Sequence, residues 1–535
     1  MTNGLLLWAD DEMELLKPHL LFLEKKGYEV VTATNGLDAV EQCKERQFDL
    51  VLLDEMMPGL SGLETLQRIK QIQPTVPIVM VTKSEEEDIM NEAVGRNIAD
   101  YLIKPVNPNQ ILLTLKKLIH RRALVAETTQ TAYQQQFQQL GMQIMDCRTW
   151  EDWTDVYRQL VQWELELTAT DSAMGDMLRM QKEEANIGFA KFVKQNYMSW
   201  IASRNVTAAP KTASRTSGNG QADATAPLMS PDVFKRKVFP LLNEGEQVWL
   251  IVLDNFRYDQ WKTIEPELSD FEIEQQVYCS ILPTATQYAR NAIFSGLMPD
   301  QISRMFPQLW VDENEEEGKN LNESPLIQTQ IDRYRRHDTF TYHKINSAAE
   351  ADTMMSQLGT ISKSQLNVVV FNFIDMLSHA RTESKMVREL AHDEAAYRSL
   401  TLSWFRHSAL SQLLRHLAQT DCRVVLTTDH GSIRTTTPVK IVGDRNTNTN
   451  LRYKLGKNLS YNDRDLFTIH EPHKAQLPSP NLSTSYVFAT GDAFFAYPNN
   501  YNYYVSYYRN TFQHGGISME EMMIPLVTLR GKKKG

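Results

Sequence analysis

The sequence has few cysteines and lacks a long apolar run. Its 535 residues include four cysteines, which lie far apart without a Cys-x-x-Cys pair. Neither a disulfide framework nor a cysteine-ligated zinc site is therefore expected. No apolar segment approaches the ~20 residues that a membrane helix needs. The short run Leu5–Trp8 leads into Asp10 rather than into a signal-peptide cleavage site, so we expect a cytoplasmic protein.

Positively charged residues are also fewer than negatively charged ones. The chain has 56 Lys and Arg against 66 Asp and Glu, a formal net charge of -10. This balance argues against a chain that coats nucleic acid, although it leaves room for a local basic pocket. The 42% of hydrophobic and 23% of charged residues are ordinary for a globular chain with several cores. At roughly 100–200 residues per domain, we expect about three domains.

The first part of the chain alternates short apolar runs with segments of helical periodicity. This alternation predicts a parallel sheet with helices on both faces. The five expected strands are residues 5–8, 29–32, 50–53, 78–81 and 101–103.

Polar side chains follow four of these expected strands. They are Asp10, Asp11, Asp54, Thr82 and Lys104. All five belong at the carboxyl edge of one sheet, where three carboxylates would repel one another unless a cation joined them. Oxygen ligands of this kind suit Mg²⁺. Lys104 and Thr82 would then hold the oxygens of a phosphoryl group on Asp54.

Two segments carry a specific resemblance. Residues 54–62 (DEMMPGLSG) and 99–105 (ADYLIKP) resemble the phospho-acceptor loop and fifth strand of response-regulator receiver domains. For residues 1–120 the resemblance implies a flavodoxin-like (βα)5 fold, phosphorylation at Asp54, and Mg²⁺ ligands at Asp10, Asp11 and Asp54. It also implies switch roles for Thr82 and Tyr101. We expect phosphorylation to favour a homodimer through the face built from residues 85–120.

A helical spacer and a tether are expected next. Residues 121–204 show no strand pattern, and apolar residues such as Trp153, Tyr157, Leu160 and Trp163 recur at helical spacing. We predict a helical bundle. Residues 205–229 are rich in Ala, Thr, Ser, Gly and Pro, and they have too few large apolar side chains to offset the entropy of ordering. This composition predicts a flexible linker between units that fold independently.

Residues 230–535 again predict an α/β domain with polar groups at its strand ends. Six candidate metal ligands lie after apolar runs or, for His514, before a glycine pair: Asp254, Asp375, His379, Asp429, His430 and His514. They divide into two three-ligand sets, each with the open position that a catalytic zinc requires. Two metals about 3.5–4 Å apart can clamp both oxygens of a phosphoryl displacement. Thr286, at the start of a helix, is a candidate nucleophile.

The motifs resemble the alkaline-phosphatase superfamily, and within it PglZ domains, over about residues 245–530. They are Asp254-Asn255, Pro283-Thr284-Ala285-Thr286, Asp375-x-x-x-His379, Thr428-Asp429-His430-Gly431 and His514-Gly515-Gly516. The resemblance implies one Zn²⁺ held by Asp254, Asp429 and His430, and another held by Asp375, His379 and His514. Sets of Asp and His also accept Mn²⁺. The second Thr attacks in the phosphodiesterase branch, so we choose Thr286, with Thr284 as the alternative.

Four residues are candidate substrate ligands. Asn255 follows a metal ligand, and Arg445, Arg452 and Lys454 lie in a polar segment after His430. Basic side chains beside a metal pair would suit substrate phosphates. A solvated loop without a binding role is the alternative interpretation of this segment.

The order of receiver, helical spacer and PglZ-type domain resembles response regulators of the type IX secretion system over the whole length. This implies a sensor histidine kinase partner, an alternative sigma factor, and phosphodiesterase activity on oligonucleotides, including cyclic ones. One alternative is a phosphorylation-switched binding regulator, acting on a sigma factor or promoter, with a structural or vestigial metal site. Another is a DNA-binding transcription factor, although no compact helix-turn-helix pattern is present in residues 230–535.

Overall fold

The computed structural model describes residues 3–73, 76–82, 98–168, 174–206, 226–312, 320–391, 393–443, 447–461, 466–481 and 483–532. The chain divides into two compact units, Met1–Gln136 with Glu166–Met174, and Phe137–Leu165 with Gly175–Gly535. Most of the expected linker 205–229, much of the expected dimer face 85–120, and Arg445 lie outside the described residues. Among the described residues, no helix combines the length and the apolar character that a membrane crossing needs.

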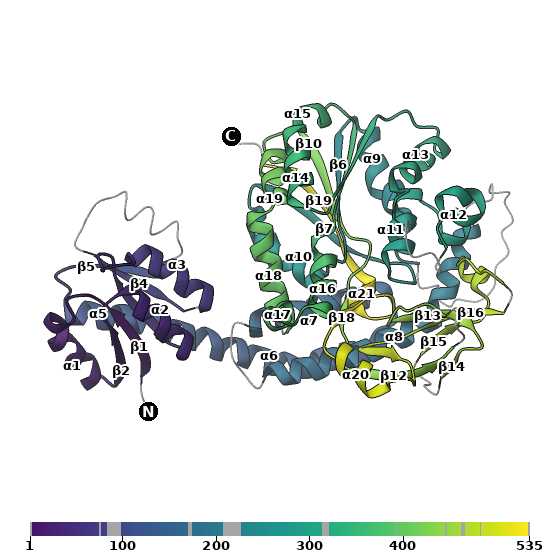
Figure 1. Cartoon of the computed structure of the whole chain (residues 1–535). Coiled ribbons are helices and arrows are strands. Elements are labelled where there is room, and N and C mark those ends of the chain that lie inside the picture. Colours follow the sequence, from purple (N-terminus) through teal and green to yellow (C-terminus); the bar gives the residue numbers. More distant parts are fainter. Residues whose placement is uncertain are drawn as a thin grey trace. The chain divides into compact units, whose positions relative to one another are not determined.

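The first unit contains a five-stranded parallel sheet (Figure 1). Its strands are β1 (Gly4–Ala9), β2 (Tyr28–Ala33), β3 (Leu50–Asp54), β4 (Ile78–Thr82) and β5 (Asp100–Ile103). Their order is β2-β1-β3-β4-β5, and every neighbouring pair is parallel. This is the flavodoxin-like doubly wound order, so the predicted receiver fold is confirmed.

Alternating side chains of the strands contribute to two apolar cores, one on each face of this sheet. Leu7 and Val51 pack with the helices α2 and α3, whereas Trp8 and Leu52 pack with α1 and α5. The helical elements are η1 (Met13–Leu16), α1 (Lys17–Lys25), α2 (Gly36–Glu45), α3 (Gly62–Ile72), α5 (Pro108–Leu115) and η2 (Lys116–His120). Strands covered on both faces leave only their ends accessible to ligands.

Three long helices follow the receiver, and they confirm the predicted helical spacer. They are α6 (Arg121–Asp146), α7 (Trp150–Thr168) and α8 (Met174–Val206). Aromatic rings join α7 to α8, for example Trp153 against Phe189 with ring centroids 5.7 Å apart. Residues 137–165 and 175–206 belong to the same compact unit as the C-terminal domain. This differs from the expectation of independently folding units, because the spacer buries part of its surface against that domain.

The second unit is built on a six-stranded sheet of order β7-β19-β10-β6-β9-β8. Its strands are β6 (Gln247–Leu253), β7 (Phe271–Cys279), β8 (Phe340–Ile345), β9 (Leu366–Phe371), β10 (Cys422–Thr427) and β19 (Met523–Gly531). β8, β9, β6 and β10 run parallel, and β19 runs antiparallel to both β10 and β7. The central strands β6, β9 and β10 are almost wholly buried.

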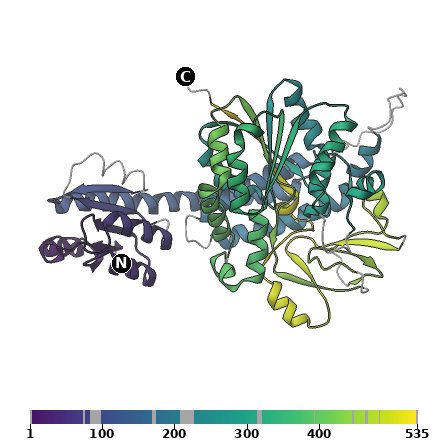
Figure 2. The same cartoon turned by 45° about the horizontal axis from the view of Figure 1, so that its top comes forward.

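Helices cover both faces of this sheet (Figures 1 and 2). One face packs against α9 (Phe239–Asn243), α11 (Thr286–Ser295) and α13 (Glu323–Arg333), whose apolar side chains form one core with Leu250 and Val368. Helices on the other face are α10 (Tyr258–Ile264), α14 (Ala348–Ser356), α18 (Glu394–His407) and α19 (Ala409–Leu417). The predicted α/β layering of this domain is confirmed.

Small sheets lie between β10 and β19 in the sequence. They are formed by β11 (Ile433–Arg434) with β18 (Phe512–Gln513), by β12 (Thr437–Val442), β14 (Ser460–Tyr461) and β17 (Ala493–Ala496), and by β13 (Tyr453–Lys457), β15 (Phe467–Ile469) and β16 (Thr484–Phe488). The remaining helical elements are η3 (Ser230–Asp232), η4 (Phe234–Val238), η5 (Glu265–Leu268), α12 (Pro299–Met305), η6 (Pro307–Leu309), α15 (Leu358–Ile361), α16 (Phe373–Glu383), α17 (Lys385–Leu390), η7 (Pro472–Ala475), α20 (Tyr501–Tyr508) and α21 (Met519–Met522).

Candidate functional site

The receiver unit gathers its predicted acids at the carboxyl edge of its sheet. Asp10 follows β1 and Asp54 ends β3, and both are buried, whereas Asp11 is exposed. One carboxylate oxygen of each residue lies within 4.8 Å of the others. Three oxygen donors at this spacing fit a hard divalent cation such as Mg²⁺.

Lys104 lies between two of these acids. Its Nζ is 2.8 Å from Asp10 Oδ2 and 3.1 Å from Asp54 Oδ2. Burial raises the pKa of Asp54, and the hydrogen bond from Lys104 opposes that rise. Burial lowers the pKa of Lys104, but its hydrogen bonds to Asp10 and Asp54 raise it overall. Lys104 therefore stays charged and compensates the acid pair.

The two predicted switch residues lie on neighbouring strands. Thr82 ends β4 and is buried, and Tyr101 lies on β5 with 37% of its surface exposed. The parallel register pairs Met80 with Tyr101 and Thr82 with Ile103. The switch roles of both residues stay predictions.

The second unit brings Asp254, Asp429 and His430 together. Asp254 follows β6, and the other two residues follow β10, its parallel neighbour. The register pairs Thr427 with Val252, so the two strands end at nearly the same level. All three side chains are buried, and one ligand atom of each lies within 4.8 Å of the others.

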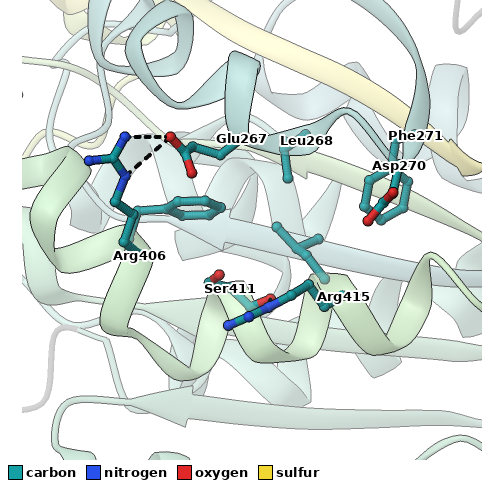
Figure 3. Close-up of a pocket in the computed structure, with 9 residues that line it drawn as sticks. Glu267, Leu268, Asp270, Phe271, Arg406, Ser411 and Arg415 are labelled. Atoms are coloured by element: carbon teal, nitrogen blue, oxygen red, sulfur yellow. Dashed lines mark hydrogen bonds and ion pairs between the residues drawn. The ribbon is translucent and has the colours of Figure 1, made fainter. Parts of the chain in front are cut away.

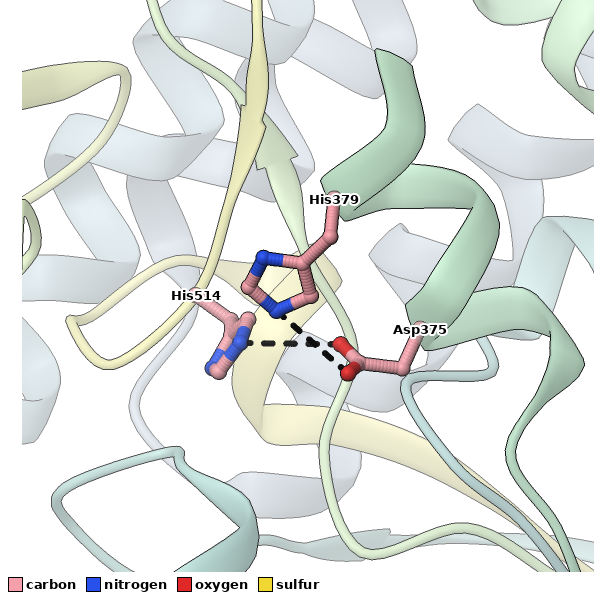
Figure 4. Close-up of side chains that lie close together, drawn as sticks. All are labelled: Asp375, His379 and His514. Carbon is pink, nitrogen blue, oxygen red and sulfur yellow. Dashed lines mark ion pairs between the residues drawn. The ribbon is translucent and has the colours of Figure 1, made fainter. Parts of the chain in front are cut away.

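Asp375, His379 and His514 form a second set (Figure 4). The first two lie four residues apart on α16, and His514 follows β18. His379 Nε2 is 3.4 Å from Asp375 Oδ2, and His514 Nε2 is 3.7 Å from Asp375 Oδ1. Figure 4 shows both imidazoles pointing toward the one carboxylate. The structure thus brings the six candidate ligands into the two sets that the sequence resemblance implied.

The two sets lie side by side. The rings of His430 and His514 are stacked, with centroids 4.2 Å apart and planes at 20°. Asn255 also joins the sets, because its backbone N–H donates to Asp429 Oδ1 at 3.4 Å and its Nδ2 donates to Asp375 Oδ1 at 3.2 Å. Asn255 has a φ of 60°, in the left-handed region that asparagine tolerates better than most residues.

Thr286 and Thr284 differ in their surroundings. Thr286 begins α11, and its Oγ1 lies 3.1 Å from His430 Nε2 and 3.3 Å from Asp254 Oδ1. Thr284 is fully buried, donates to the Gly516 carbonyl at 2.9 Å, and accepts from the Gly515 N–H at 3.0 Å. The first hydroxyl faces a ligand set, and the second is engaged with the turn that follows His514.

Backbone carbonyls fix the tautomer of two histidines. His514 Nδ1 donates to the Thr284 carbonyl at 3.1 Å, and His430 Nδ1 donates to the Gly431 carbonyl at 3.2 Å. A carbonyl only accepts, so the proton sits on Nδ1 and leaves Nε2 as the ligand atom. This is the usual arrangement around metal-binding histidines.

Sequence reasoning missed Arg290. Its Nη1 lies 2.9 Å from Asp254 Oδ2 and 3.8 Å from Asp429 Oδ2, and its Nε lies 2.6 Å from Glu323 Oε1. The guanidinium is buried and offsets the charge of the acids around it. The sequence spacing could have revealed Arg290, because it follows Thr286 by four residues and therefore shares its face of α11.

Burial dominates the electrostatics of the ligand sets. It raises the pKa of Asp254 to about 8 against the opposing effect of Arg290, and it also raises the pKa of Asp429. Burial lowers the pKa of His430, and burial together with His430 lowers the pKa of His514 to about 3. For Asp375, burial is outweighed by His379 and the other imidazoles, which lower its pKa.

These properties fit divalent cations. Neutral imidazoles and carboxylates are the ligands that zinc takes, and three per ion leave a position open. Asp429 Oδ2 is buried and accepts no hydrogen bond within the described part of the chain. A cation would compensate this oxygen and the crowded carboxylates, whose ionisation burial otherwise opposes.

Two predicted substrate ligands have other surroundings. Arg452 is fully buried and binds both oxygens of Glu521, at 3.1 and 2.6 Å. Lys454 is 1% exposed, donates to the Asn448 carbonyl at 2.9 Å, and lies 4.5 Å from the ring centroid of Tyr497. Both side chains are buried, and Lys454 lies on β13, whose side chains are mostly buried, rather than in a solvated loop. A role of these two residues in substrate binding stays a prediction.

Two cavities lie away from the ligand sets. One, of about 150 Å³, is lined by Glu267 and Arg406, whose guanidinium donates twice to one carboxylate oxygen at 3.1 and 2.7 Å (Figure 3). Another, of about 320 Å³, is lined by Tyr288, Trp310 and Tyr486. Neither cavity is lined by a candidate metal ligand.

Family comparisons cover nearly the whole chain. Residues 6–116 match the response regulator receiver domain, residues 123–201 match the PorX response regulator linker domain, and residues 233–529 match the BREX system PglZ alkaline phosphatase-like domain. The three matches follow the order that the sequence predicted.

Curated relatives and solved structures match the receiver part. The transcriptional regulatory protein ZraR of Klebsiella oxytoca is 37% identical over 127 residues, which are 24% of this chain and 29% of that protein. ResD of Bacillus subtilis is 34% identical over 128 residues, 24% of this chain and 50% of that protein. The chain thus spans half or less of these relatives. A receiver structure from Clostridium thermocellum is 30% identical, with a TM-score of 0.22, and covers 23% of this chain and 98% of that one.

The chain is a response regulator with a phosphatase-superfamily output domain. This class is defined by the receiver sheet with its acid pocket and by the second sheet with its Asp and His sets. Divalent metals and a sensor kinase partner are usual for these domains. The chain belongs to the PglZ alkaline phosphatase-like family, and its PorX linker match makes it a PorX-like response regulator, as predicted.

Proposed function

We propose that this chain is a response regulator of type IX secretion whose output domain is a di-zinc phosphodiesterase. Its proposed substrates are oligonucleotides, including cyclic ones. The observation that carries the proposal is the position of Thr286, whose Oγ1 lies 3.1 Å from one candidate zinc ligand and 3.3 Å from another. The choice of oligonucleotides rests on the resemblance to type IX secretion regulators.

The residues around Thr286 suit phosphoryl transfer. Thr286 lies at the N-terminus of α11, where free backbone N–H groups and the helix dipole favour a phosphate. Asp254, Asp429 and His430 would hold one zinc ion, and Asp375, His379 and His514 would hold the other. When bound, the two ions would lower the pKa of the attacking hydroxyl and offset charge on the phosphoryl oxygens.

The reaction proceeds in two displacements. Thr286 Oγ1 forms a bond to phosphorus as the bond to the leaving alkoxide breaks, and the hydroxyl proton ends on the leaving alcohol. Water then attacks the phosphothreonine, which restores the Thr286 hydroxyl and releases a phosphate monoester. Asn255 holds a carboxylate of each ligand set through the hydrogen bonds described above, so it acts by positioning the ligands.

The substitution Thr286→Val tests the nucleophile. It removes the hydroxyl and keeps the shape of the side chain, so zinc binding should persist while hydrolysis of bis(p-nitrophenyl) phosphate falls by about 10³-fold or more. Zinc content by mass spectrometry and initial rates would be measured together. The matched change Thr284→Val should instead lower the free energy of unfolding, because the Gly515 N–H and Gly516 carbonyl lose their buried partner.

Unchanged rates for Thr286→Val would assign the nucleophile elsewhere, with Thr284 the next candidate. A zinc-loaded wild-type protein without phosphodiester turnover would support the alternative, a phosphorylation-switched binding regulator with a structural or vestigial metal site. Arg290 is the observation that favours this alternative, because its guanidinium already offsets the charge of Asp254 and Asp429.

The receiver is proposed to control this output domain from the cytoplasm. Asp10, Asp11 and Asp54 would hold Mg²⁺, and a sensor histidine kinase would supply the phosphoryl group to Asp54. An alternative sigma factor is the proposed downstream partner. Phosphotransfer from a purified kinase to wild-type protein but not to the Asp54→Asn variant would support this assignment. Equal labelling of both proteins would contradict it.

A further inference from the structure

Helix α8 contacts the candidate hydrolase centre at two points. The contacts come from Asn186 and Tyr197, which are buried and separated by about 16 Å along the helix at a rise of 1.5 Å per residue. One contact reaches α21, the helix that is hydrogen-bonded to the metal-ligand turns, and the other reaches the turn that carries Thr286.

The first contact joins α8 to the short helix α21. Asn186 Nδ2 donates to Glu520 Oε2 at 3.0 Å, and Asn186 Oδ1 accepts from the Met519 N–H at 2.8 Å. Asn186 therefore uses both ends of its amide on neighbouring residues of α21. Such a pair of bonds fixes the position of α21 more tightly than a single bond would.

Helix α21 in turn holds both metal-ligand turns. The Glu521 carbonyl accepts from the N–H of Gly431, the residue after His430, at 3.2 Å. Glu521 Oε1 accepts from the N–H of Gly516, two residues after His514, at 2.9 Å. A shift of α21 would therefore move a ligand of each set.

A buried ionic network strengthens this connection. Lys182 on α8 lies 2.5 Å from Glu164 Oε2 of α7 and 3.4 Å from Glu520 Oε1. Glu164 also binds Arg398, at 2.7 Å. Arg398 lies 3.1 Å from Asp259 of α10. Loss of one partner in such a network leaves an uncompensated buried charge, which makes the arrangement hard to displace.

The second contact joins α8 to the nucleophile turn. The Leu282 N–H donates to the hydroxyl oxygen of Tyr197 at 2.8 Å, and both residues are fully buried. Leu282 precedes the segment Pro283-Thr284-Ala285-Thr286. Tyr197 therefore fixes the start of the turn that delivers the Thr286 hydroxyl.

We propose that α8 is a brace that sets the nucleophile turn relative to the two metal-ligand turns, with Asn186 and Tyr197 as its positioning residues. The linker helices are thus part of the hydrolase centre and not only a spacer. Gln181 Nε2 of α8 also donates to the Phe137 carbonyl of α6 at 3.0 Å, so a displacement of α6 would reach the same two contacts. Only the turnover readout below rests on the proposed function.

The first experiment compares two Tyr→Phe changes in the full chain. Tyr197→Phe removes the acceptor of the Leu282 N–H, whereas Tyr157→Phe on α7 removes a buried hydroxyl that has no hydrogen-bond partner within the described residues. We expect Tyr197→Phe to lower kcat for bis(p-nitrophenyl) phosphate by about 10-fold to 100-fold with little change in KM. It should also speed amide hydrogen exchange at Leu282. Tyr157→Phe should leave both near wild type.

The second experiment tests the contact with α21 without using activity. In the metal-free protein, Asn186→Asp places a carboxylate against Glu520 and should speed amide exchange at Gly431 and Gly516. Zinc affinity, measured by calorimetry, should fall by about 10-fold to 100-fold. Adding Glu520→Gln restores a donor to the new carboxylate, so the double variant should recover both properties. A merely structural role would lower stability while zinc affinity and exchange at Gly431 and Gly516 stayed at wild-type values.

The proposal is overturned if folded Tyr197→Phe and Asn186→Asp proteins keep wild-type exchange at these amides. It is also overturned if the double variant fails to recover zinc affinity. If wild-type protein lacks phosphodiester turnover but the exchange and affinity changes occur as expected, the proposed activity fails and the bracing role of α8 stands.

Discussion

Thr284 and Thr286 have the same side chain and are separated by one residue, yet they differ in what their hydroxyls contact. Ala285 has extended backbone and caps α11, which starts at Thr286. The turn into the helix therefore directs one hydroxyl to the ligand set and the other to the Gly515-Gly516 backbone. The sequence resemblance favoured Thr286, and the geometry gives this proposal a physical basis.

The buried side chain of Lys454 makes the free energy of unfolding depend on pH. Burial lowers the pKa of Lys454 to about 7. As pH falls from about 10 toward 7, the unfolded chain takes up a proton that the folded chain does not, so the free energy of unfolding decreases. Lys454→Met should flatten this part of the profile and raise stability at pH 7 by about 1 kcal/mol or more, because one pKa unit corresponds to about 1.4 kcal/mol.

Urea unfolding at pH values between 6 and 10 would measure the effect of Lys454→Met. Lys457→Met is a matched control, because Lys457 lies on the same strand and is exposed. Parallel profiles for wild type and Lys454→Met would show that burial does not perturb this ammonium group.

At the scale of elements, the turn after β10 and helix α21 are packed in backbone contact. A Cβ on Gly431 would lie 2.1 Å from the Glu520 carbonyl oxygen and 3.2 Å from Arg257 Cγ. The absence of a side chain at Gly431 therefore permits the hydrogen bond from its N–H to Glu521. Close backbone approach of this kind is a common reason for glycine at a turn.

The substitution Gly431→Ala should separate these two elements. We expect a loss of about 1–3 kcal/mol in the free energy of unfolding, since the clash involves backbone that cannot rotate away. Zinc affinity should fall as well, because His430 precedes Gly431. Gly359→Ala in α15 is the control, because nothing lies within 4 Å of its added Cβ. Equal stabilities of Gly431→Ala and wild type would show that the turn and α21 can separate freely.

At the scale of the whole molecule, we expect phosphorylation of the receiver to favour a dimer. Beryllofluoride with Mg²⁺ mimics a phosphoryl group on Asp54, where it adds negative charge and acceptor oxygens beside Lys104. Sedimentation velocity should then show a shift from monomer to dimer. Asp54→Asn should remain unshifted under the same conditions. A monomer under saturating beryllofluoride would contradict the prediction.

The organisation of the chain shows where sequence reasoning was sound and where it fell short. Helical periodicity predicted the helices from 121 to 204, which the structure confirms. It did not reveal that α7 and α8 pack into the C-terminal unit. The buried partners of α8 in that unit, such as Glu520 and Leu282, lie far from it in the sequence. The composition of residues 205–229 predicted independent units, because a local composition does not show which distant segments the helices contact.

The sequence by itself determined the family, the two α/β folds and the candidate metal ligands. Apolar strands that end abruptly in Asp or His have a local signature, and parallel strands bring their carboxyl ends to one edge. That rule grouped Asp10 with Asp54, whereas the resemblance to the alkaline-phosphatase superfamily implied the pairing of Asp254 with Asp429.

Only the tertiary structure decided the remaining features. Arg290 lies between two carboxylates, Arg452 and Lys454 are buried with partners of their own, and α8 holds the nucleophile and metal-ligand turns. Each of these depends on contacts between segments far apart in the chain. A local pattern gives the type of a side chain and its element, whereas its burial and its partner are set by the packing of the whole domain.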